Sequence, residues 1–171
     1  MTSPPPSPEM SLQLRRVFQA PRERVWATWT QREQLEEWMC KDVPAHNPKY
    51  VELDVRPGGR YVMEIPIPGG KYVGQGTFRE VKPPEKLVFT WSWTRLPEKP
   101  GEYLGGASLV TVELFDRGAS TEMVFTHTGL ETSGIREDTR TGWLGCFEVL
   151  AGLLARLQAR LQARLQEGSL T

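Results

Sequence analysis

Apolar and polar residues alternate along much of the first two thirds of the chain, and this pattern predicts a series of strands. Leu12 and Leu14 open the first run, which we expect to end at Ala20. The clearest alternation falls within residues 86–96, where one face carries Leu87, Phe89, Trp91 and Trp93. Short turns rich in glycine and proline separate the later runs. We therefore expect six or seven sequential strands that form an antiparallel meander.

Two short helices are expected directly after the first strand. Pro21 suits the first position of a helix, where a missing N–H costs nothing, and Val25 and Trp29 then give that helix an apolar face. Thr30 and Glu33 have the spacing of a capping box, which predicts that a second helix begins at Thr30.

The last part of the chain has the period of a long helix with one buried face. Apolar residues recur there every three or four positions, at Trp143, Phe147, Leu150, Leu154, Leu157 and Leu161. We expect this helix to span residues 139–166, a length of roughly 40 Å, whereas a strand of ten residues covers about 33 Å. Leu161 and Leu165 should then lie beyond the sheet, where a homodimer through the C-terminal helix could cover them. A frayed end is the alternative.

Together these elements predict an α+β fold in which a curved antiparallel sheet wraps around the long C-terminal helix. Residues 10–166 should form a single domain. Residues 1–9 are rich in proline and serine, so we expect a disordered tail there, and a second disordered segment at 167–171.

Composition and charge narrow the function classes. The 171 residues include 21 Lys plus Arg and 21 Asp plus Glu, so no basic surplus suggests a nucleic-acid partner. No apolar run reaches the roughly 18 residues that a membrane span needs, and the first residues lack the pattern of a signal peptide. We therefore expect a cytoplasmic protein with two reduced cysteines, Cys40 and Cys146.

Several segments, in this order and spacing, resemble a known family. They are residues 18–30, 56–65, 76–93, 108–114 and 121–130, with Gly142 and Trp143 at the start of the last helix. The chain is similar to the SRPBCC superfamily, also called START-like or birch-pollen-allergen-like. Within it, the chain resembles homologues of the activator of the ninety-kilodalton heat-shock-protein ATPase. The resemblance covers roughly residues 11–157. It implies a helix-grip fold with a cavity between sheet and helix.

Many members of that superfamily bind lipids, sterols or aromatic molecules, so a small apolar ligand is the partner that the resemblance implies. Aromatic and methionine side chains of the expected strands and helix are the candidate ligand-binding residues, since such linings suit planar or flexible apolar molecules. This set comprises Met63, Phe89, Trp91, Trp93, Met123, Phe125, Trp143 and Phe147. Core packing is the simpler interpretation of each residue taken alone.

An enzyme of the cyclase or hydrolase type is the first alternative function. His127 ends the last expected strand, with Glu113 and Glu64 on neighbouring strands as candidate catalytic carboxylates. We favour a structural role for His127, as a strand-end histidine that bonds a backbone carbonyl, because no second catalytic partner has motif spacing. A co-chaperone or stress-response partner protein is the second alternative. The two His and two Cys residues lack the spacing of metal ligands, and no motif suggests a cofactor.

Overall fold

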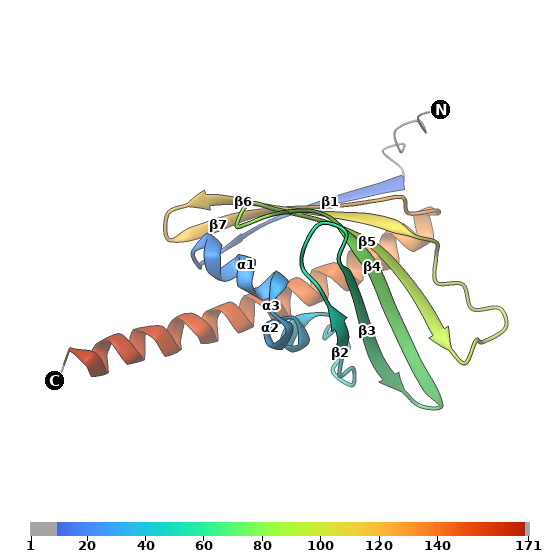
Figure 1. Ribbon diagram of the computed structural model, residues 1–171, viewed down its shortest axis with the longest axis horizontal. Coiled ribbons are helices and arrows are strands. Elements are labelled where there is room, and N and C mark those ends of the chain that lie inside the picture. The colour runs from blue at the N-terminus through green and yellow to red at the C-terminus, as the bar shows by residue number, and fades with distance from the viewer. Residues whose placement is uncertain (1–9, 170–171) are drawn as a thin grey trace.

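The structure, a computed structural model, describes residues 10–169 of the chain. This part folds into one seven-stranded sheet and three α-helices (Figure 1). Their bounds, in chain order, are β1 (Ser11–Phe18), α1 (Arg22–Thr30), α2 (Arg32–Trp38), β2 (Lys49–Leu53), β3 (Arg60–Ile67), β4 (Gly70–Lys82), β5 (Lys86–Leu96), β6 (Ser108–Arg117), β7 (Ser120–Thr128) and α3 (Ser133–Gly168).

The sheet is antiparallel throughout, with the strand order β1-β7-β6-β5-β4-β3-β2. Strands β2 to β7 form the expected meander, and β1 adds to the far edge with Leu14 opposite Phe125. Figure 1 shows α3 crossing one face of this curved sheet, with α1 and α2 beside it. The expected α+β helix-grip fold is confirmed.

The alternation in β5 sets the face that α3 covers. Leu87, Phe89 and Trp91 are at most 8 % exposed and point to the helix side. Tyr61 and Met63 of β3 and Phe125 of β7 lie on the same face and are also buried. Period-two alternation thus places one side of each strand in a single core under α3.

The second helix does not begin as the sequence suggested. α2 starts at Arg32 after Gln31, and no side-chain hydrogen bond caps it. The Thr30 hydroxyl instead donates to the carbonyl of Trp26, one turn back in α1 (2.9 Å). The capping-box prediction is wrong because Thr30 is still the last residue of α1, where back-bonding to the preceding turn competes with capping.

The long helix is longer at both ends than its apolar pattern predicted. It begins at Ser133, six residues before the expected start, because the side chain of Thr132 accepts a hydrogen bond from the N–H of Ile135 and caps it. It continues through Gly168, so residues 167 and 168 are helical and not part of a disordered end. The expected tail at 1–9 and residues 170–171 lie outside the described residues.

The C-terminal part of α3 extends past the sheet. Leu154 is the last buried residue of the helix, and Figure 1 shows the helix projecting alone beyond that region. Over its 36 residues the helix is roughly 54 Å long. Leu165 is 73 % exposed, as the comparison of helix and strand lengths predicted. Among the described residues, no helix is long and apolar enough to cross a membrane.

Removal of the overhang should leave the domain folded. A chain that ends after Gln158 loses only exposed or half-buried helix, and we expect its free energy of unfolding to fall by less than about 1 kcal/mol. Trp143→Ala should instead cost about 3–5 kcal/mol, because Trp143 is only 4 % exposed in the core. Thermal or denaturant melts of both variants test this. Equal losses would show that the overhang contributes to the core.

The half-buried Leu161 and the exposed Leu165 also allow a test of the homodimer, which stays a prediction. If Leu161 and Leu165 pair with a second copy, the wild-type protein should sediment as a dimer at tens of micromolar. The double variant Leu161→Glu, Leu165→Glu should then sediment as a monomer. Gln162→Glu, Gln166→Glu adds the same charge beside the stripe and is the matched control. A monomeric wild-type protein would mean that the overhang is solvated.

Candidate ligand-binding cavity

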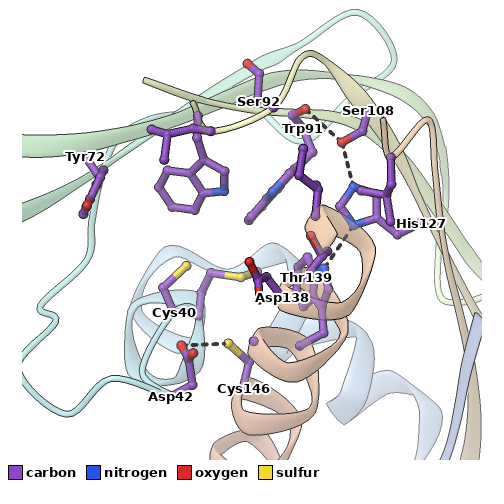
Figure 2. A pocket seen from close by; sticks show the side chains of 18 of the residues that line it. Cys40, Asp42, Tyr72, Trp91, Ser92, Ser108, His127, Asp138, Thr139 and Cys146 are labelled. Carbon is purple, nitrogen blue, oxygen red and sulfur yellow. Dashed lines mark hydrogen bonds between the residues drawn. The ribbon is translucent and has the colours of Figure 1, made fainter. Parts of the chain in front are cut away.

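A cavity of about 330 Å³ lies between the sheet and the N-terminal third of α3 (Figure 2). Three connecting segments complete its wall: the loop after α2, the loop between β5 and β6, and the link from β7 to α3. This volume is at the lower end of the range typical of small-molecule sites.

Trp143 marks the boundary between this hollow region and the packed core. Residues after it on α3, such as Phe147 and Leu150, are fully buried against the sheet. Residues before it, such as Ile135 and Thr139, line the cavity. The Trp143 ring lies 4.5 Å from the Phe125 ring and 5.1 Å from the Trp91 ring, measured between centroids. One indole therefore forms the inner wall of the cavity.

Aromatic rings also form the sheet side of the cavity. Trp91 and Trp93 follow each other on the inward face of β5, with centroids 5.4 Å apart and planes nearly perpendicular (86°). Tyr72 of β4 meets the far side of Trp93 at 6.4 Å. Gly74 makes room for this arrangement, because a Cβ there would lie only 3.1 Å from the Trp93 ring and 3.2 Å from the Met63 methyl.

A directed chain of hydrogen bonds connects α3 to the sheet at the inner end of the cavity (Figure 2). The Trp143 indole can only donate, so Nδ1 of His127 accepts its N–H at 3.1 Å. The proton of His127 therefore resides on Nε2, which donates to Oγ of Ser108 at 2.7 Å. Ser108 in turn donates to the carbonyl of Trp91 at 3.2 Å. Each polar group in this chain is satisfied.

The direction of these bonds gives His127 a structural role. A general base needs an unprotonated nitrogen facing the nucleophile, yet the nitrogen that faces Ser108 carries the proton. Burial lowers the pKa of His127 from 6.5 to about 4, so the ring is neutral at pH 7. Its partners are two side chains, Ser108 and Trp143, and not the backbone carbonyl that the sequence suggested.

Neither candidate carboxylate lies on the same side of the sheet as His127. Val110 pairs with His127, whereas Glu113 pairs with Val124, so period-two alternation puts the Glu113 side chain on the opposite face. Glu64 lies on β3, next to the buried Met63, and forms an ion pair with Lys71 at 2.9 Å. The expected cluster of His127, Glu113 and Glu64 does not form, because neighbouring strands bring residues together only when their parity matches.

The structure also divides the candidate ligand-binding set. Trp91, Trp93 and Trp143 line the cavity. The other five residues pack in the core outside the cavity: Met63, Phe89, Met123, Phe125 and Phe147. The sequence left open which strand face turns inward. Phe125 packs against Phe147 of α3, whereas Phe89 packs against Trp29 of α1. The position of a residue along its strand decides whether an inward side chain reaches the cavity, and alternation does not encode that position.

Two cysteines that are distant in sequence line the cavity near its mouth. Cys40 follows α2 and Cys146 belongs to α3, and both are free thiols. The Cys146 thiol donates to a carboxylate oxygen of Asp42 at 3.5 Å. Burial raises the pKa of Cys146 to about 12 and also raises the pKa of Cys40, so both thiols are protonated and weakly nucleophilic.

Glu131 holds one side of the mouth together. One of its carboxylate oxygens accepts the N–H of Gly106 at 2.9 Å, and the other accepts the hydroxyl of Tyr103. These bonds fix the β5–β6 loop, whose residues Leu104 to Gly106 line the cavity. Among residues 10–169, no three His, Cys, Asp or Glu side chains come close enough to hold a metal ion. Sequence analysis missed these loop residues, because loops carry no periodic pattern.

The geometry defines a helix-grip domain with an aromatic cavity, and comparisons with known proteins agree on the class. Among solved structures, a protein from Chromobacterium violaceum is 25% identical with a TM-score of 0.73, over 85% of this chain and 96% of that one. A protein from Arthrobacter aurescens is 23% identical with a TM-score of 0.74, over 86% and 87%. One from Rhodobacter sphaeroides is 21% identical with a TM-score of 0.71, over 90% and 97%. No curated protein matches the chain.

The model of one family, described as activator of Hsp90 ATPase homolog 1-like protein, matches residues 19–155. The chain belongs to this family, as the sequence resemblance indicated. The matched residues include the first two helices, strands β2 to β7 and the buried part of α3.

The buried His127 predicts a specific pH dependence of stability. Below pH 6.5 the unfolded chain binds a proton at this residue, whereas the folded protein does so only near pH 4. The free energy of unfolding should therefore fall by about 3 kcal/mol through His127 as the pH drops from 6.5 to 4. Denaturant titrations at several pH values in this range give the free energy of unfolding of wild type and of His127→Gln. The contribution of His127 is the difference between the slopes of the two plots of free energy against pH. Identical slopes would show that His127 titrates alike in both states.

Proposed function

We propose that this protein binds a small hydrophobic molecule in the cavity between the sheet and α3. The observation that supports this most is the hollow bounded by Trp91, Trp93 and Trp143, in a fold whose other inward residues pack solidly. Aromatic walls of this kind suit planar apolar ligands, whose burial contributes about 25 cal/mol for each Å² removed from water.

The hydrogen bonds around His127 support binding over catalysis. Trp143, His127 and Ser108 satisfy one another, so none of them needs the ligand as a partner and none is poised to take a proton from it. A surface of this type holds an apolar body without reacting with it. The co-chaperone alternative rests on the family description alone, and we do not propose it.

The neutral dye N-phenyl-1-naphthylamine tests this function. It should bind the folded protein with a micromolar dissociation constant, equivalent to about −8 kcal/mol, and its fluorescence should rise as it leaves water. Thr139→Trp places a ring in the cavity and should weaken binding at least tenfold. Thr111→Trp, on the opposite face of β6, is the matched control and should bind as wild type does. Equal binding by the two variants would place the dye outside the cavity.

A further inference from the structure

Carboxylates predominate among the titratable side chains from the loops and the first helical turns that line the cavity, where His46 is also present. Asp42, Glu131 and Asp138 are among its lining residues, and no Lys or Arg belongs to the described lining. None of the three forms an ion pair within 4 Å in the part of the chain that the structure describes. The chain as a whole is electrically balanced, so this one-sided charge is a local feature.

Two of these carboxylates face the same part of the mouth from different elements. Asp42 follows α2, and its Oδ2 lies 3.8 Å from the position that a Cβ on Gly142 would occupy. Asp138 is one helical turn before Gly142 on α3, so the two residues lie on one face of the helix. Figure 2 shows both side chains below the aromatic wall of the sheet. A cation placed between the two carboxylates would be attracted to both.

An unpaired donor inside the cavity is a second and independent observation. Trp91 is 92 % buried, since only 8 % of it is exposed, and it lines the cavity. Its indole N–H donates to no acceptor among the described residues, and the nitrogen is accessible from the cavity. Figure 2 shows this indole projecting from the sheet toward α3. A donor that is accessible from the cavity and has no protein acceptor can bond to a ligand that supplies an acceptor or a π-face.

We infer that the cavity selects an amphipathic organic cation: an aromatic body that packs against Trp91 and Trp93, with an ammonium group at the mouth beside Asp42 and Asp138. The inference rests on the proposed function and adds the charge class of the ligand. The indole faces favour the same charge, because tryptophan is the aromatic side chain that attracts cations most strongly. Fatty acids and other organic anions are disfavoured, since the described lining has three carboxylates and no Lys or Arg.

The test uses three compounds that share a naphthalene group and differ in charge, so that differences in affinity report the effect of charge. They are naphthylmethyl trimethylammonium, its uncharged carbon isostere, and naphthylmethanesulfonate. Each competes with N-phenyl-1-naphthylamine, and direct calorimetry replaces the competition if the dye does not bind. At low salt, the cation should bind roughly tenfold more tightly than the sulfonate, with the neutral isostere between them. Because the acids are at the solvent-exposed mouth, 0.5 M NaCl should narrow this difference.

The double variant Asp42→Asn, Asp138→Asn should reduce the cation–anion difference to about threefold or less, and leave the affinity for the neutral isostere unchanged. Glu131 is retained in it, because that residue holds the β5–β6 loop. Glu37→Gln, Glu52→Gln removes the same net charge from exposed positions that do not line the cavity, and should keep the wild-type difference.

The two proposals fail in distinguishable ways. If the neutral isostere binds in the cavity and the three compounds have equal affinities, the charge inference is wrong and hydrophobic binding stands. If the control variant loses the preference as much as the test variant does, the preference comes from net charge and the inference is again wrong. If the dye binds in the cavity but none of the three compounds does, the charge inference alone is wrong. If neither the dye nor the three compounds bind, both proposals are wrong.

Discussion

The packing of Trp143 between helix and sheet is the constraint on which the rest of the structure depends. Its ring contacts Phe125 and Trp91, and its N–H binds His127, so apolar packing and a directional bond fix the same point of α3. Later residues of the helix, such as Phe147, are buried in the packed core. Before Trp143, α3 stays far enough from the sheet to leave a cavity. Trp143 thus lies where the packed part of the interface meets the part that encloses the cavity.

The hydrogen bond from Trp143 to His127 also determines how the polar groups in this apolar interior are oriented. An indole donates but cannot accept, so it determines the tautomer of His127, and the tautomer determines which way the Ser108 hydroxyl points. Burial keeps the ring neutral, since a charged imidazolium would have to direct a second N–H against the indole N–H. The polar groups at the inner end of the cavity are therefore already bonded to one another, and they offer little hydrogen bonding to a ligand.

The mouth of the cavity is acidic whereas the interior is aromatic, and two of the three carboxylates at the mouth come from connecting segments. Asp42 comes from the loop after α2, Glu131 from the link to α3, and Asp138 from the first turns of the helix. Loop residues can vary without disturbing a core, so the aromatic interior and the acidic rim are separable features. Under the proposed function, apolar burial would supply affinity in the interior, and the acidic rim would discriminate between ligands by charge.

The sequence by itself determined the strands, the long helix and the family, because each depends on local periodicity or on the order of short segments. Alternation also grouped Phe89, Trp91 and Trp93 on one face of β5, but only the packing of the helices decided that this face turns inward. The sequence also named Trp91, Trp93 and Trp143, which line the cavity, among its candidate residues. Only the tertiary structure decided that Phe125 and Phe147 fill the core instead, since this depends on how far along the sheet α3 makes contact. Strand register, which no local pattern encodes, separated Glu113 from His127 and brought Ser108 to it. The meeting of Asp42 with α3 likewise joins residues about a hundred positions apart, and only the folded chain brings them together.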